Sequence, residues 1–285
     1  MTLLAVGFVL LSAVLHATWN LLAKRAQGDA SFTWLYDVLA LLIFFPAVFV
    51  FILFSHASFS AWAFVFIIVS GLLELAYFLL LQRGYRVGDL SLVYPLARGT
   101  GPLLTTVVAI LVLREHPTPL ALFGTGCVVG GVLLIAWRPQ RLSERRSRLA
   151  VLYGILTGCC IAGYTLWDKE ALSIGHLAPL ILYYGTICVH VPVLTPFALH
   201  HWREVRFHWR VHRLEALGIA VLSAFSYVLV LTALVFTPVS YIAPAREISV
   251  LFGTLLGTRL LAEGETRRRL VAAGIIVVGI LALAL

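Results

Sequence analysis

The chain has 285 residues, of which 61% are hydrophobic and only 12% are charged. A soluble globular domain carries about 25% charged residues, so this composition excludes a fold whose whole surface faces water. The net charge of +8 would suit nucleic acid in a soluble protein. Here the Arg residues fall in short segments between apolar stretches, where they orient a membrane protein, and we expect no nucleic-acid partner.

Ten apolar segments follow one another along the chain, and each is long enough to cross a hydrocarbon layer of about 30 Å as a helix. They are too long for barrel strands, so we predict an all-α integral membrane protein with ten transmembrane helices. The first segment lacks the basic start and the cleavage site of a signal peptide and is expected to be retained. The segments are 3–22, 32–54, 61–82, 90–113, 118–137, 149–168, 177–199, 214–236, 240–258 and 267–285.

The loops that follow odd-numbered segments hold nearly all the Lys and Arg residues, whereas the even-numbered loops hold only Arg114 and Lys169. Positively charged loops stay in the cytoplasm. The odd loops are therefore predicted to be cytoplasmic and both termini to lie outside, in a plasma membrane or bacterial inner membrane. No loop is long enough for an extramembrane domain, so function is expected among the helices.

The two halves of the chain share a pattern at a spacing of 148 to 149 residues. Each half would hold five spans, so the second half enters the membrane from the opposite side, as in the inverted repeats of many transporters. We predict repeats at 1–137 and 149–285, joined by a basic cytoplasmic linker at 138–148. The matching positions are Trp19-Asn20 with Trp167-Asp168, Ser91 and Pro95 with Ser240 and Pro244, and Glu115, Gly126 and Gly131 with Glu263, Gly274 and Gly279.

At these positions the sequence resembles the EamA-type module of the drug/metabolite transporter superfamily. The first half carries SLVYPLARGTGPLL and then LREHPTPLALFGTGCVVGG, and the second half carries SYIAPAREISVLFGTLL and then LLAEGETRRRLVAAGIIVVGIL. The resemblance covers essentially the whole chain. It implies two inverted five-helix repeats around a central cavity and transport of small metabolites by alternating access, and it leaves the substrate open.

Four ionisable residues lie deep within predicted spans. Because inserting a charged side chain into a membrane is costly, each is expected to have a structural or functional role. They are Glu74, Arg98, Arg246 and Glu247. Glu74 and Arg98 fall at similar depth on consecutive segments, so we predict that they form a pair. Such an ion pair either only offsets the energetic cost of burying its two charges, or it anchors a charged substrate or acts as a proton-linked switch. Because Arg246 and Glu247 are neighbours in sequence, their side chains should point in different directions on a helix.

Aromatic and polar side chains near these charges are candidates for the cavity wall. A belt at the membrane interface is the alternative explanation for the aromatic ones, and a lone His is more often packed than functional. Pro95 and Pro244 are candidate hinges, or packing kinks. The candidate wall residues are His16, Trp19, Asn20, Tyr77, Tyr94, Tyr164, Trp167, Tyr227 and Tyr241.

Small residues and cysteines are given structural interpretations. The GxxxG patterns at Gly126/Gly130, Gly154/Gly158 and Gly253/Gly257 are expected to pack helices within the chain, with dimerisation as the alternative. The four Cys residues lie in apolar segments without metal-ligand spacing, so neither a metal nor a cofactor is expected.

The sequence therefore predicts a secondary transporter, more specifically an exporter, of a small polar metabolite such as an amino acid or another zwitterionic or anionic compound. It would work in the lipid bilayer as a monomer or homodimer, with proton coupling left open. An organic-cation or drug exporter of the same fold is one alternative. An intramembrane lipid-processing enzyme is another, although no GxSxG, HExxH or ATP-binding GxxxxGK[ST] motif occurs, and no enzyme activity is expected.

Overall fold

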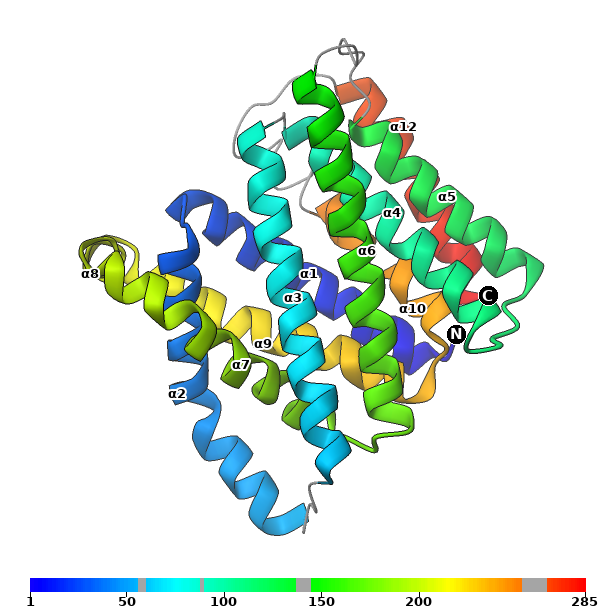
Figure 1. Ribbon diagram of the computed structural model, residues 1–285. Helices are drawn as coiled ribbons and strands as arrows, with labels where there is room; N and C mark the ends of the chain where they lie inside the picture. The colour runs from blue at the N-terminus through cyan, green and yellow to red at the C-terminus, as the bar shows by residue number, and fades with distance from the viewer. Residues whose placement is uncertain (56–59, 88–89, 137–144, 253–265) are drawn as a thin grey trace.

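The described part of the chain is all helical (Figure 1). The computed structural model describes residues 1–55, 60–87, 90–136, 145–252 and 266–285. No strand occurs within those ranges, as predicted. The helices are α1 (Leu3–Ala26), α2 (Ala30–Ser55), α3 (Ala61–Val87), α4 (Leu90–Leu111), α5 (Pro119–Ala136), α6 (Arg145–Ser173), α7 (Pro179–His200), α8 (Trp202–Val211), α9 (Arg213–Phe236), α10 (Val239–Ala245) and α12 (Thr266–Ala284).

Six helices are long and apolar enough to cross a membrane, namely α1, α2, α3, α6, α7 and α9. Apolar side chains cover their outer faces, and on α2 the side chains of Leu42 and Phe45 are 67% and 57% exposed. Such exposure suits a bilayer, in which these side chains meet lipid rather than water. The described residues thus establish a multi-pass membrane protein without establishing ten spans, because α5 and α12 hold only shorter apolar stretches and α10 has seven residues.

Polar residues placed just before the helices explain where several of them begin. Asp29 Oδ1 accepts hydrogen bonds from the backbone N–H groups of Ser31 (2.9 Å) and Phe32 (3.3 Å) at the start of α2. Ser60 and Thr118 cap α3 and α5 in the same way through their hydroxyl oxygens. Each cap satisfies N–H groups that have no partner within the helix.

Helices of the two halves pack against one another in a symmetric pattern. Counting helices along each half, with α8 left out, pairs them as α1 with α6, α2 with α7, α3 with α9, α4 with α10 and α5 with α12. In this pairing, the contact between α1 and α9 is the counterpart of the contact between α6 and α3. The corresponding helices α2 and α7 touch each other, and so do α5 and α12. Elements that contact their own counterparts lie around a two-fold axis. The packing therefore relates the two halves by a pseudo-two-fold axis.

The α5–α12 contact depends on glycine. A Cβ atom at Gly124 would lie 2.6 Å from the carbonyl oxygen of Gly279, and a Cβ at Gly279 would lie 2.7 Å from the carbonyl oxygen of Gly124. Both distances are too short for real atoms, so only glycine allows this approach of the two backbones.

The GxxxG prediction is half right. A Cβ at Gly154 or Gly158 would meet α4 side chains within 3 Å, so this pair packs helices as expected. Gly126 and Gly130 have nothing within 4 Å and pack against no neighbour, which contradicts the packing role predicted for them. They point away from α12, whereas Gly124 faces it. Gly253, Gly257 and Glu263 lie outside the described residues.

The predicted ninth segment is not one continuous helix. After α10 the chain makes a turn at Arg246 and Glu247, and helix resumes at Ile248. Pro244 has no N–H for the Ser240 carbonyl, and beyond it Glu247 N–H bonds back only three residues, to the Pro244 carbonyl at 3.1 Å. The corresponding helix α4 runs without a break through Pro95. Proline alone therefore does not decide where the break occurs.

The connection from α9 to α10 is held from both sides. The Glu115 carboxylate accepts hydrogen bonds from the N–H groups of Val239 (2.8 Å) and Ser240 (2.9 Å). Lys169 Nζ donates to two carbonyl oxygens at the end of α9, at 2.7 and 3.1 Å. These charged groups satisfy free helix ends and fix the start of α10.

A short helix, α8, occupies the loop predicted between the seventh and eighth segments. Val205 and His208 are buried against the rest of the molecule, while Arg203, Arg206 and Arg210 are exposed on the other side. No secondary structure was predicted within this loop from the sequence. Its spacing of apolar and basic residues follows the helical period and could have indicated one.

Candidate functional site

A cavity of about 420 Å³ lies among the helices of both halves. Its wall is built by α1, α2, α3, α4, α6, α7 and α9, together with the turn that follows α10. Ten of the residues predicted for the cavity wall or the binding site line it: His16, Trp19, Asn20, Glu74, Tyr77, Tyr94, Arg98, Tyr164, Tyr227 and Arg246.

Three predicted residues lie outside the cavity wall. Trp167 Nε1 donates to the Phe66 carbonyl at 3.0 Å, and the Tyr241 hydroxyl accepts from the Thr118 backbone N–H at 3.1 Å. Both contacts join helices and leave no polar atom directed at the cavity. Glu247 is buried behind Arg98.

Arg98 is neutralised by Glu247 and not by Glu74, so the predicted Glu74–Arg98 pair does not form. Arg98 Nε lies 3.2 Å from Glu247 Oε2, and these side chains are only 9% and 3% exposed. Arg98 Nη2 also donates to Ser249 Oγ at 3.1 Å and lies 3.2 Å from His16 Nε2. Consecutive helices were expected to pair, but α4 crosses to the second half instead.

Arg246 has no counter-ion among the described residues. Its guanidinium carbon lies 5.6 Å from the centre of the Tyr227 ring, within the range of a cation–π contact. The side chain lines the cavity, and no carboxylate of the described chain lies within ion-pairing distance. The turn after α10 thus presents a free positive charge to the cavity.

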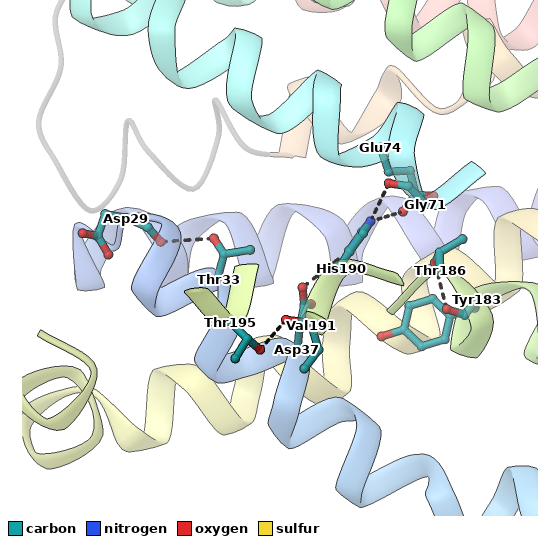
Figure 2. Close-up of polar contacts among 10 residues, drawn as sticks. All are labelled: Asp29, Thr33, Asp37, Gly71, Glu74, Tyr183, Thr186, His190, Val191 and Thr195. Atoms are coloured by element: carbon teal, nitrogen blue, oxygen red, sulfur yellow. Dashed lines mark hydrogen bonds and ion pairs between the residues drawn. The ribbon is translucent and has the colours of Figure 1, made fainter. Parts of the chain in front are cut away.

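An acidic cluster faces the same cavity from three other helices (Figure 2). His190 of α7 lies between two carboxylates, with Nδ1 at 3.5 Å from Asp37 Oδ2 of α2 and Nε2 at 3.7 Å from Glu74 Oε2 of α3. His190 Nε2 is also 3.1 Å from the Gly71 carbonyl oxygen. Glu74 Oε1 is buried and has no hydrogen-bond partner within the described chain, so the cluster has spare acceptor capacity.

A third carboxylate, Asp168, lies just behind the wall and is fully buried. It accepts hydrogen bonds from the hydroxyl groups of Ser70 and Tyr227. Tyr227 therefore contacts Arg246 through its ring face and Asp168 through its hydroxyl. This one side chain connects the basic and acidic parts of the site.

Aromatic rings form the apolar part of the wall. The ring centres of Tyr77 and Tyr164 are 6.1 Å apart, those of Tyr164 and Tyr227 are 6.5 Å apart, and those of Tyr227 and Tyr183 are 6.3 Å apart. Such edge contacts stabilise each ring in place. Among the described residues, no group of three or more His, Cys, Asp or Glu side chains could hold a metal ion.

Comparison with known proteins places this arrangement in a family. The sequence matches the EamA-like transporter family over residues 3–137 and again over residues 148–285. The chain belongs to that family. Its two matched regions give the EamA two-repeat architecture, and the protein is a transporter of the drug/metabolite type.

A solved crystal structure has the same fold as this EamA-like transporter. The two superpose with a TM-score of 0.75 over 98% of this chain and 95% of the other chain, at 14% sequence identity. Identity this low supports the fold alone. No curated protein sequence matches the chain.

Sequence reasoning missed two residues of the EamA-like site, His190 and Asp37. Both are ionisable residues within apolar helices, and that alone marks a candidate in a membrane protein. Asp37 lies in the first third of α2, and its contact with His190 comes from the packing of α2 against α7. His190 was not considered, although no Asp, Glu, Lys or Arg and no other His occurs in α7 before its last residue, His200.

Proposed function

We propose that this EamA-like transporter exports a small zwitterionic or anionic metabolite, such as an amino acid, by alternating access. The observation that carries the proposal is the free charge of Arg246 in the same cavity as the acidic Asp37–His190–Glu74 cluster. Arg246 is half-buried, and a cation within a membrane protein that has no ion-pair partner is costly. An anionic group of the substrate would remove that cost, which gives the cavity a preference for it.

The two ends of the site suggest how a zwitterion would lie. Its carboxylate would contact Arg246, which can make two parallel hydrogen bonds to a carboxylate. Its ammonium group would contact Glu74, whose Oε1 has no partner. The rings of Tyr77, Tyr164 and Tyr227 would enclose the apolar part.

Alternating access is supported by the architecture. The cavity lies between two similar halves, and one of the helices that approach it is broken where Arg246 enters the wall. Secondary transporters with repeated halves bind substrate in this position, at interrupted helices. Pro244 precedes the break and would serve as a hinge, and Pro95 is proposed as its counterpart in α4.

Proton coupling is proposed at the Asp37–His190–Glu74 cluster. A His side chain between two carboxylates can hold or release one proton, and its charge state sets the charge that the substrate meets. We further propose that the protein lies in a plasma membrane or bacterial inner membrane, and the distribution of Lys and Arg favours odd-numbered loops in the cytoplasm and both termini outside.

The test is counterflow in proteoliposomes. Vesicles preloaded with a mixture of unlabelled L-amino acids are diluted into a ¹⁴C-labelled mixture of the same amino acids, and label should accumulate without any ion gradient. Parallel vesicles receive labelled succinate or labelled tetraphenylphosphonium with the matching internal load. Accumulation of amino acids or succinate would support the substrate class, whereas counterflow of tetraphenylphosphonium alone would contradict it and favour the organic-cation alternative.

Coupling is tested with the same vesicles and an imposed pH gradient. A gradient should drive net accumulation by wild-type protein, and His190→Gln should retain counterflow but lose the gradient-driven part. If His190→Gln still accumulates label in response to the gradient, coupling does not occur at this cluster.

A further inference from the structure

Arg98 and Glu247 occupy equivalent positions in the two halves. Ser91 and Pro95 of α4 correspond to Ser240 and Pro244, and the same spacing carries Arg98 onto Glu247. The two residues thus have opposite charge at the same place in the repeat. In the structure they contact each other, with Nε and Oε2 3.2 Å apart.

This contact locates the pseudo-two-fold axis. A residue that touches its own symmetry counterpart lies at the axis, because any other position would separate the two copies. The contacts of α2 with α7 and of α5 with α12 place the axis between the same two halves independently. The ion pair therefore crosses the axis, between α4 and the turn after α10.

We propose that the Arg98–Glu247 pair is a positioning contact on this axis, which joins the two halves throughout the transport cycle and takes no part in binding substrate. The inference rests on the proposed alternating-access function. When two inverted halves exchange conformations, every off-axis contact is replaced by its counterpart, but a contact on the axis is its own counterpart. It can persist in both states without breaking.

The surroundings of the pair fit this role. Arg98 Nη2 donates to Ser249 Oγ and lies close to His16 Nε2, so a second guanidinium nitrogen besides Nε is engaged within the protein. Arg98 Nε and Glu247 Oε2 are buried and make no well-aligned hydrogen bond. The pair is joined mainly by charge, which tolerates a change of angle better than a directional hydrogen bond does.

The contact also explains the difference between two neighbouring arginines. The positive charge of Arg98 is neutralised by Glu247. A substrate carboxylate would therefore have to displace Glu247 in order to bind Arg98. Arg246 lies one residue before Glu247 on the same turn and remains free. The axis pair thereby holds the turn that presents Arg246 to the cavity.

Charge exchange tests the proposal. We compare Arg98→Glu, Glu247→Arg and the double variant that carries both changes, using counterflow of the ¹⁴C-labelled amino-acid mixture. Each single change places like charges together and should abolish transport. Ser249 and His16 can each act as donor or acceptor, so the double variant should regain the wild-type half-saturating concentration and most of the wild-type maximal rate.

The half-saturating concentration separates positioning from binding. A double variant that is folded but has lost transport, or that needs about tenfold more substrate, would make Arg98 a ligand and overturn the proposal. Should the double variant fail to insert, Arg98→Gln supplies the same readout: a lower maximal rate at unchanged half-saturation supports positioning, and a raised half-saturation overturns it. Loss of counterflow in the wild-type protein would contradict the proposed function instead.

Discussion

Arg98 and Arg246 differ in their partners although both line one cavity. Arg98 comes from an unbroken helix and contacts a carboxylate, a hydroxyl and a ring nitrogen. Arg246 comes from a broken helix, and its guanidinium lies over the face of the Tyr227 ring without an ion pair to any described residue. Both helices carry the same Ser-x-x-x-Pro pattern. A repeated motif can therefore supply a structural ion pair in one half and an arginine that faces the cavity in the other.

The largest effect is expected from removing the partner of Arg98. Glu247→Ala leaves a buried, uncompensated cation and should destabilise the protein by about 3–5 kcal/mol. The measurement is unfolding of the purified protein in mixed micelles. The matched control is Arg98→Met with Glu247→Leu, which removes both charges and should cost much less. Equal losses in the two proteins would mean that the site tolerates an unpaired charge, and the contrast between the arginines would disappear.

Removing the free charge should affect binding rather than stability. Arg246→Gln deletes the proposed carboxylate contact and should weaken binding by about 10- to 100-fold, the value of a hydrogen-bonded charge. Binding is measured by the rise in unfolding temperature that the ligand produces. Arg246→Lys keeps the charge and should retain part of the affinity. A large loss of stability without ligand would show that Arg246 is paired after all.

A third variant separates the two roles of Tyr227. Tyr227→Phe keeps the ring beneath Arg246 but removes the hydroxyl that donates to Asp168. The buried carboxylate would lose a donor, and the protein should be destabilised by about 1–3 kcal/mol. Tyr77→Phe is the control, because no hydrogen bond from its hydroxyl occurs within the described chain. Equal stability of the two variants would argue against a structural role for the Tyr227 hydroxyl.

The smallest effect is expected outside the membrane spans, at His208 of α8. Burial lowers the pKa of His208 below its usual 6.5, although Asp29 lies 3.8 Å away and acts in the opposite direction. The unfolded chain therefore binds a proton that the folded protein does not, so stability should fall as pH drops through about 6.5. Unfolding of wild type and His208→Gln is measured between about pH 8 and about pH 5.5, and the decline in stability should be shallower in the variant.

Much of the fold follows from the sequence. Apolar length alone predicts helices such as α2 and α7, because in lipid only a helix satisfies the backbone of a segment this long. The break at Arg246 could not be predicted, because Pro95 and Pro244 have the same local sequence effect but only one of them precedes a break. Tertiary contacts of the surrounding residues decide between the two outcomes.

The sequence predicted most of the residues of the candidate site, but it did not predict which of them contact each other. Glu74, Arg98 and Arg246 were recognised because charge within an apolar segment is costly. Their partners depend on which helices cross, and sequence proximity wrongly favoured Glu74 for Arg98. His190 was missed because a neutral His adds little to a hydropathy profile, so its meaning appears only once Asp37 and Glu74 are placed beside it.

The first and last described residues of the chain lie close together, which follows from the arrangement of the two halves. The Met1 amino group donates to the Ala284 carbonyl at 3.2 Å, and the two ends lie side by side in Figure 1. A short peptide could therefore close the chain into a ring. A circularly permuted protein with new ends between the two matched regions would then begin with the second half. We expect its helices to pack in the same places. For the described chain we therefore expect the packing of the helices not to depend on which half is synthesised first.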